Sequence, residues 1–228
     1  MRVENTSSAL TNLRNAPKIS SRPTQATEGR KTLGETPPVK VPLDQLGALS
    51  GLFGRAGVVT RLTRKLNRLK HKKCRVTPAK GTIACVDSDG LVYLGVDFLR
   101  AYQNREDVVA GVMAHEWGHA CAERPDPDEV DQMNWNDIFA LRREHETLAD
   151  DISGRLLALL GYSPEGLIAF LTNGKDTHNL KYHSKKTRSE IIRQAYGDEK
   201  RKIALAKEMF RNSLYANDHT SQLIDEDV

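Results

Sequence analysis

The sequence predicts an α+β fold that is mostly helical and contains one small sheet of antiparallel type. Between residues 72 and 95, short apolar runs alternate with turn residues, a pattern typical of short strands. GTIACV and LVYLG flank the tetrapeptide DSDG, so these two runs are expected to form a hairpin. After residue 95, apolar residues recur at helical spacing. The chain of 228 residues, 39% of them hydrophobic, can build one core of ordinary size.

Glycine, serine and proline mark the ends of the expected helices. Gly161 is placed as a helix C-terminal glycine, and Ser163 and Pro164 as the N-cap and first turn of the next helix. The acidic segment 123–137, which contains two prolines, is predicted to be a loop, and a polar loop around 172–186 should precede basic C-terminal helices. The predicted helices are roughly 95–103, 105–122, 138–160 and 163–171, with a loose helix or turn at 43–57.

Three parts of the chain differ in composition. Residues 1–43 hold five of the nine prolines and many Ser, Thr and Asn without apolar periodicity, so a disordered tail is predicted there. Residues 44–195 are expected to form the globular domain. Residues 196–228 are expected to form a C-terminal helical extension with an acidic end. The tail could also act as a non-classical export signal, although no other feature points to export.

Composition also limits the class of protein. No apolar run approaches the roughly 20 residues that cross a bilayer, and the N-terminus lacks the apolar centre of a secretory signal. We therefore expect a soluble, cytoplasmic protein without a transmembrane segment. The three cysteines have no CxxC spacing, so neither a disulfide framework nor a cysteine zinc knuckle is indicated.

A basic segment covers residues 58–75. Lysine and arginine dominate it from residue 61 onward and no acid occurs there, so it could contact phosphate or an acidic surface. The simpler interpretation is an amphipathic helix whose basic side is solvated. Its apolar residues recur at helical spacing: Val58, Val59, Leu62, Leu66 and Leu69.

The stretch AHEWGHACAE carries the clearest chemistry of the sequence. His115 and His119 lie one helical turn apart on the same face, so each can direct one ring nitrogen at a single cation. Glu116 is rotated away from this face and can reach a water molecule beside the metal. This is the HExxH pattern of zinc hydrolases. The alternative is a pair of buried histidines that hydrogen-bond to backbone groups.

A catalytic zinc ion normally has three protein ligands and one open position. On the following long helix, Glu146 and Asp150 share a face with small and apolar residues, where unpaired carboxylates would be costly. Glu146 is therefore predicted to be the third ligand. Asp150 is predicted to accept a hydrogen bond from a ligand histidine and fix its tautomer. Alternatively, both acids pair with arginines of their own helix, namely Arg142, Arg143 or Arg155.

EDVVAGVMAHEWGHACAER and EHETLADDISGRLLALLGYSPEGLIA together resemble the gluzincin metallopeptidases of the CAAX prenyl protease and HtpX family. The resemblance covers about residues 58–195 and implies a zincin-like fold. It also implies zinc ligands at His115, His119 and Glu146 and a catalytic base at Glu116. LVYLGVDFL resembles the family's substrate-binding edge strand and the helix after it. The short spacing between the two motifs implies a subfamily with a trimmed intervening domain.

In the same family a histidine-proline pair and an arginine follow the second motif. Here KYHSKKTRSEII offers His183 and Arg188 without the proline and at altered spacing. Tyr182 or His183 could donate a hydrogen bond to the oxyanion formed during peptide hydrolysis, and a plain loop histidine is the alternative.

The function expected from these residues is that of a zinc metalloendopeptidase with one Zn²⁺ ion. A zinc-bound water would attack the peptide carbonyl while Glu116 acts as general base. The protein or peptide substrate would pair with residues 91–94, expected to be an edge strand bordering the active-site helix. The alternative is a zinc-containing nucleic-acid-binding or interaction module that uses the basic helix 58–75. Nucleic acid is otherwise not an expected partner.

Overall fold

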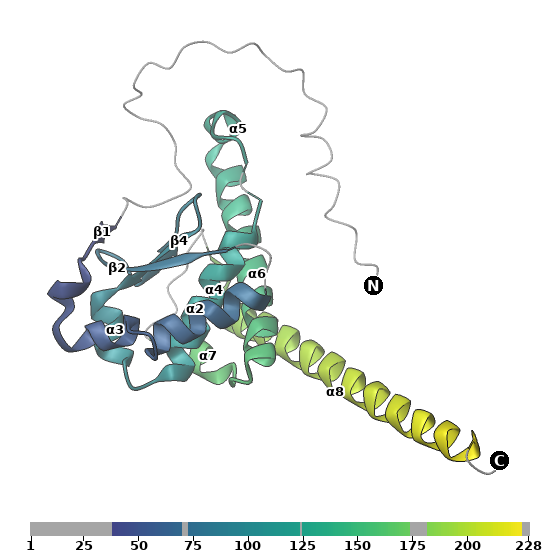
Figure 1. Ribbon diagram of the computed structural model, residues 1–228. Coiled ribbons are helices and arrows are strands. Elements are labelled where there is room, and N and C mark those ends of the chain that lie inside the picture. The colour runs from purple at the N-terminus through teal and green to yellow at the C-terminus, as the bar shows by residue number, and fades with distance from the viewer. Residues whose placement is uncertain (1–37, 70–72, 124, 174–181, 225–228) are drawn as a thin grey trace. The chain divides into compact units, whose positions relative to one another are not determined.

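The computed structural model describes residues 38–69, 73–123, 125–173 and 182–224 (Figure 1). These residues form a mostly helical α+β structure with one four-stranded sheet, as predicted. The predicted disordered tail lies almost wholly outside the described residues. Its predicted end at residue 43 is too late, because a short strand, β1 (Val39–Lys40), pairs with the sheet and is followed by the 3₁₀ segment η1 (Leu43–Phe53).

The sheet is mixed, which corrects the prediction of an antiparallel-type sheet. The expected hairpin is present: β3 (Ala84–Val86) runs antiparallel to β4 (Leu91–Gly95). The Asp87 side chain closes its turn by accepting hydrogen bonds from the backbone N–H groups of Asp89 and Leu91. However, β2 (Arg75–Lys80) pairs with β4 in parallel. The sequence pattern located the strands but not the partner of β2, because that partner is chosen by contacts far apart in the chain.

Residues 91–94 do not form an edge strand. The strand order is β1-β2-β4-β3, so β4 is hydrogen-bonded on both sides and β3 lies at the edge. Val92 and Leu94 of β4 are fully buried. A nearly continuous apolar run such as LVYLG is typical of a central strand, whereas edge strands are often very short, as β3 is.

The basic segment forms a shorter helix than predicted. Helix α2 (Val58–Leu69) buries Val58, Val59, Leu62 and Leu66, and Arg75 already belongs to β2. Its core contacts extend to the motif helix through Asn67, whose side-chain oxygen accepts a hydrogen bond from Trp117 Nε1 at 3.2 Å. The same oxygen accepts from the backbone N–H of Cys74 at 2.9 Å. The helix is therefore part of the core, with its basic side toward solvent.

Two long helices position the candidate site. Helix α4 (Glu106–Cys121) carries the HEWGH motif and is buried over most of its surface. Helix α6 (Trp135–Leu160) ends, as predicted, at Gly161, whose φ of 81° places it in the left-handed region. The predicted loop 123–137 is only partly a loop, because it contains α5 (Pro127–Gln132) and the start of α6. Asp126 caps α5 in a capping box with Glu129, a local signal the prediction overlooked.

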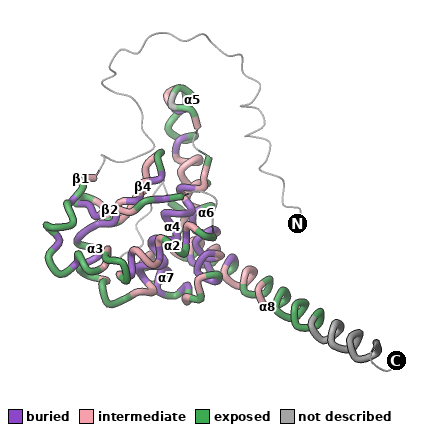
Figure 2. The backbone as a smooth tube through the Cα atoms, in the orientation of Figure 1, coloured by how far each residue is buried: buried purple, intermediate pink, exposed green. Residues whose placement is uncertain are grey.

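Two further helices complete the helical half. Helix α3 (Val96–Tyr102) follows β4, and α7 (Glu165–Thr172) follows the long helix, with the Ser163 hydroxyl accepting a hydrogen bond from Glu165 N–H as a cap would. A single helix, α8 (Lys185–Ile224), replaces the several basic helices expected and runs through the predicted domain boundary at residue 195. One face of its first turns is buried, at Ser189, Ile192 and Ala195, and its exposure increases after about residue 200 (Figure 2). No helix of the described residues is long and apolar enough to cross a membrane.

Candidate metal centre

Helices α4 and α6 approach each other closely where the two sequence motifs meet. A Cβ atom at Gly118 would lie 2.6 Å from the Cα atom of Ala149, so only glycine fits at this position. The small side chain of Ala149 leaves room for this approach, and Gly118 supplies the other half of the space. The close contact of Gly118 with Ala149 brings side chains at neighbouring positions of α4 and α6 within reach of one another.

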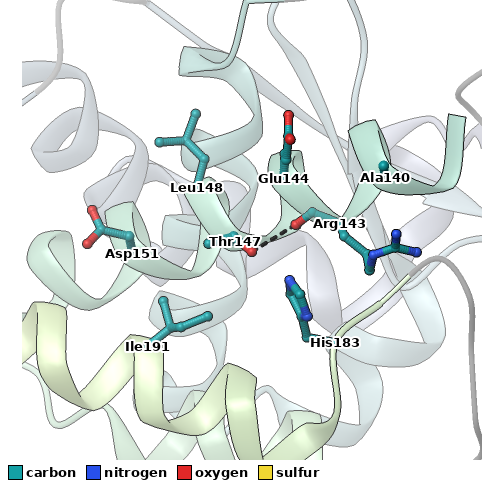
Figure 3. Close-up of a pocket in the computed structure, with 8 residues that line it drawn as sticks. All are labelled: Ala140, Arg143, Glu144, Thr147, Leu148, Asp151, His183 and Ile191. Carbon is teal, nitrogen blue, oxygen red and sulfur yellow. Dashed lines mark hydrogen bonds between the residues drawn. The ribbon is translucent and has the colours of Figure 1, made fainter. Parts of the chain in front are cut away.

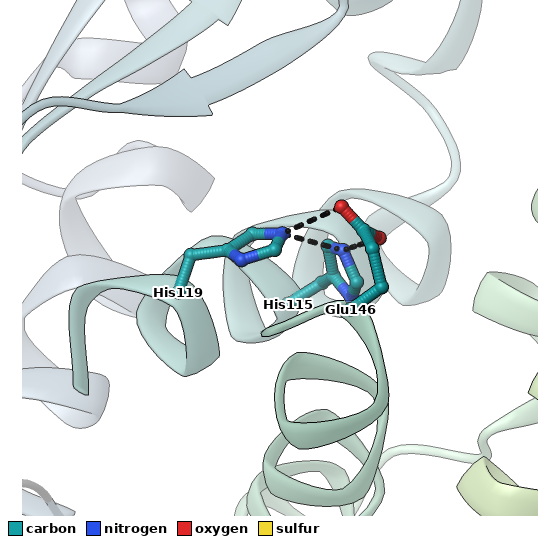
Figure 4. Close-up of side chains that lie close together, drawn as sticks. All are labelled: His115, His119 and Glu146. Carbon is teal, nitrogen blue, oxygen red and sulfur yellow. Dashed lines mark hydrogen bonds and ion pairs between the residues drawn. The ribbon is translucent and has the colours of Figure 1, made fainter. Parts of the chain in front are cut away.

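The two predicted ligand histidines and the predicted ligand glutamate converge on one point (Figure 4). The Nε2 atoms of His115 and His119 lie 3.1 Å apart. Glu146 places Oε2 at 3.4 Å from His115 Nε2 and Oε1 at 3.4 Å from His119 Nε2. Ligands at ~2.0–2.1 Å around a tetrahedral zinc ion are separated from each other by ~3.3–3.4 Å. The three side chains are therefore spaced as the ligands of one small cation would be.

Exposure increases across the cluster from one side to the other. The side chain of His115 is 10% exposed, that of Glu146 16% and that of His119 21%. A bound ion would thus be covered on the His115 side and accessible to solvent on the His119 side. This is the arrangement a site with one open coordination position requires.

Asp150 lies beside His115, although the predicted hydrogen bond to the ring is not formed with regular geometry. Its Oδ1 atom is 3.1 Å from Nδ1 of His115, at ion-pair distance, and its side chain is completely buried. Because the other ring nitrogen, Nε2, faces the cluster, a carboxylate on Nδ1 favours the tautomer that leaves Nε2 free to bind a metal.

Arg188 completes the cluster and was not assigned to it from the sequence. This residue of α8 donates to both oxygens of Asp150, from Nε at 2.7 Å and from Nη2 at 2.9 Å. Its Nη2 atom also lies 3.1 Å from Glu146 Oε2. The alternative in which an arginine pairs with these acids is thus partly correct, but the arginine comes from another helix. Its position one turn before the buried Ile192 indicates that Arg188 lies on the packed face of α8, but not which residue it contacts.

Two of the arginines named in that alternative, Arg155 and Arg143, have other surroundings. Arg155 forms a bidentate pair with Asp151 on the adjacent face of α6, at 2.8 and 2.9 Å. Arg143 lines a separate pocket of about 520 Å³. The contacts shown for Glu146 and Asp150 are those with the two histidines and Arg188.

Charge in the cluster is balanced only if a further positive charge is present. Two buried carboxylates face one arginine. Burial lowers the pKa of His115, but Asp150 and Glu146 outweigh it and raise that pKa to about 10. Burial disfavours the charged form of Glu146, and the two histidines reverse this and hold its pKa far below the usual range. Without a metal, a protonated His115 supplies the balancing charge; with a metal, the ion can supply it.

Glu116 is buried on α4 between the two histidines in sequence. Burial raises the pKa of its carboxyl above the ordinary value, while the nearby charges of His119 and His115 oppose the shift. Among the described residues, no hydrogen bond to its side chain is found. A carboxyl with a raised pKa beside a metal site is suited to accept and return a proton.

The two residues predicted to stabilise an oxyanion lie apart from the three ligands. His183 lines the 520 Å³ pocket on another face of α6, together with Arg143, Glu144 and Thr147 (Figure 3). The Cζ atom of the Arg188 guanidinium lies over the ring of Tyr182, 5.5 Å from the centre of that ring. Tyr182 thus touches the cluster through Arg188, and His183 is not brought to it.

Comparison with known proteins assigns no family: no family model matches the chain, and no curated protein matches it. The structure brings together the predicted ligands His115, His119 and Glu146, which could hold a metal ion, and adds Arg188 to the predicted Asp150 behind them.

Proposed function

We propose that the protein is a zinc-dependent endopeptidase with its active centre between α4 and α6. The observation that carries this proposal is the convergence of two imidazole nitrogens and one carboxylate at tetrahedral spacing, next to a buried glutamate with a raised pKa. Two His and one Glu are a ligand set of catalytic rather than structural zinc sites. The proposal includes a relationship of this chain to the CAAX prenyl protease and HtpX family.

Zinc bound at this position would supply a Lewis acid and lower the pKa of a water molecule to about 7. The residues of the chain have separate tasks. Glu116 accepts the proton of the attacking water and returns it to the leaving amine. Asp150 orients His115 through Nδ1, and Arg188 holds both Asp150 and Glu146 in place.

The substrate peptide is proposed to pair with β3 rather than β4. Backbone hydrogen bonds from Gly95 N–H to Ile83 and from Asp87 N–H to Leu91 show which β3 residues face β4. By the alternation of an antiparallel ladder, the backbone groups of Ala84 point to the outer side, where the Thr82 hydroxyl donates to the Ala84 carbonyl at 3.1 Å and an added strand would replace it. Among the described residues, no strand pairs with this side, and β3 packs against α4. An extended peptide added there would lie next to the motif helix.

Glu116→Gln tests the proposal. The amide keeps the size of the side chain but cannot take a proton, so the variant should bind as much zinc as the wild type and lose cleavage of casein by at least about 100-fold. Elemental analysis and mass spectrometry of the digest give the two readouts. Cleavage at the wild-type rate would contradict the role of Glu116.

The alternative function, a nucleic-acid-binding module, has one observation in its favour. Arg64, Lys65 and Arg68 lie on the solvent side of α2, while Arg61 is paired with Glu106 at 2.6 Å. Phosphate binding by this side would weaken steeply with salt and would not depend on Glu116. Binding of double-stranded DNA measured at two salt concentrations separates the two functions.

A further inference from the structure

The N-terminal part of α6 extends past the end of α4. His119 lies opposite Glu146 and His115 opposite Asp150, so the two helices run antiparallel. Because α4 ends at Cys121, the part of α6 before about residue 144 has no α4 residue opposite it. This part of α6 follows directly on α5 (Figure 1).

An aromatic pair, Trp135 and Phe139, lies on that part of α6. Their ring centres are 6.0 Å apart, with the ring planes tilted by 30°. Trp135 is 57% exposed, although tryptophan is usually largely buried. Phe139 lies seven residues before Glu146 and Trp135 eleven, which places both on the helix face that carries Glu146. The aromatic pair therefore extends the metal-binding face of α6 toward solvent.

The aromatic pair lies on the open side of the candidate metal centre. The exposed fraction of the ligand side chains increases from His115 to His119, that is, toward the C-terminal end of α4. Because α6 runs antiparallel to α4, the same direction leads along α6 from Glu146 to Phe139. A substrate that reaches the metal from solvent approaches from this side. Exposed aromatic rings that continue a binding face are typical contact residues for a ligand.

We propose that the aromatic pair binds a large apolar side chain of the peptide substrate. This inference rests on the proposed endopeptidase function and adds a substrate preference to it. Phe139 and Trp135 are about 10 and 16 Å along the helix from Glu146. An extended peptide advances about 3.3 Å per residue. The preferred apolar residue is thus about three to five positions from the cleaved bond.

The test compares cleavage of a mixture of peptides by the wild type and by the double variant Trp135→Ala, Phe139→Ala. Mass spectrometry identifies the cleaved bonds. The wild type should prefer a large apolar residue three to five positions from the bond on one side, and the double variant should lose this preference. For one preferred peptide, KM should rise about tenfold while kcat changes little, as expected for a lost apolar contact.

Two control variants separate binding from folding. Leu148→Ala removes an exposed apolar side chain that is closer to Glu146 in sequence than the aromatic pair is. Leu148 lies on the pocket face of α6, so the cleavage profile of this variant should match that of the wild type. Trp135→Phe keeps an aromatic ring and should retain most of the preference. All variants should contain as much zinc as the wild type.

Each other outcome identifies which claim is wrong. A wild type that cleaves without apolar preference, or a double variant with an unchanged profile, overturns the inference and leaves the endopeptidase function intact. Zinc loss and a fall in kcat in the double variant also overturn it, because the pair would then support the metal centre. So does faster cleavage, which would mean that another segment covers the pair. A zinc-containing wild type that cleaves no peptide overturns the proposed function, and the inference with it.

Discussion

Each end of helix α4 carries a cluster of charged side chains, and the two clusters differ in how their members pair. At the N-terminal end, Arg61 donates to one oxygen of Glu106 at 2.6 Å and the Tyr162 hydroxyl donates to the other. Every contact there joins a donor to an acceptor. At the C-terminal end, the Nε2 atoms of His115 and His119 face each other at 3.1 Å, and a carboxylate faces both.

The difference separates a structural cluster from a binding site. The first cluster is complete without a ligand, and its ion pair is about 40% exposed, where such pairs contribute little to stability. The second is buried and contains several lone pairs directed at one point. Groups of that kind are costly to bury unless a cation or a proton joins them.

Asp150→Asn should weaken zinc binding by about 10- to 100-fold, the range typical of residues that orient a ligand histidine. The substitution removes the carboxylate that lies 3.1 Å from His115 Nδ1 and also breaks the bidentate pair with Arg188. Competition with a chelator of known affinity measures the change. Unaltered affinity would show that Asp150 does not act on the metal site. Asp151→Asn, on the adjacent face of α6, is the matched control.

Zinc affinity should increase about tenfold for each pH unit between pH 7 and the His115 pKa. In the metal-free protein that pKa is raised to about 10, so the imidazole is protonated at neutral pH and must lose its proton when the metal binds. Glu146 is already ionised, because its pKa is lowered, and releases no proton. Calorimetry in two buffers of different ionisation heat at pH 7.5 should detect at least one released proton. Binding without proton release would contradict the charge balance described for the cluster.

Gly118→Ala should destabilise the fold by about 1–3 kcal/mol, the usual cost of overpacking a core. The added Cβ would meet backbone atoms of Ala149, which cannot move without separating α4 from α6. Chemical denaturation gives the free energy of unfolding. Zinc binding by the folded fraction should also weaken, because the ligands belong to both helices. A variant of wild-type stability would mean that the helices are less tightly packed than described.

Tyr162→Phe should have the smallest effect, about 0.5–1.5 kcal/mol at most, because it removes one hydrogen bond from a partly exposed cluster. Burial and the neighbouring Glu106 raise the pKa of Tyr162 to about 12, so its hydroxyl remains a donor over the whole working pH range. Zinc content should not change. A loss of zinc in this variant would show that the two ends of α4 are not independent.

Much of the site could be predicted because its signals are local. The spacing of His115 and His119 needs only the helical repeat, and Glu146 and Asp150 stand out as acids on an otherwise apolar face. The end of α6 at Gly161 and the hairpin around Asp87 are also local. Each of these features depends on residues within about one or two turns of one another.

The missed features depend on contacts between distant segments. Arg188 reaches Asp150 across 38 positions of sequence, and no short pattern announces that contact. The pairing of β4 with β2 on one side and β3 on the other is decided by the whole sheet, so the edge position of residues 91–94 was predicted wrongly. His183 was matched to a family histidine by its order in the sequence, at altered spacing, and the structure places it in a pocket on another face of α6.

The most direct test of the account compares the two glutamates that distinguish the clusters. Wild type, Glu146→Ala and Glu106→Ala are loaded with zinc, dialysed and analysed for metal content. We expect about one zinc ion per chain for the wild type and for Glu106→Ala. Glu146→Ala removes a ligand, so its zinc affinity should fall by more than the ~10- to 100-fold expected for a residue that only orients a ligand. Equal zinc content in all three proteins, or none in the wild type, would contradict the account.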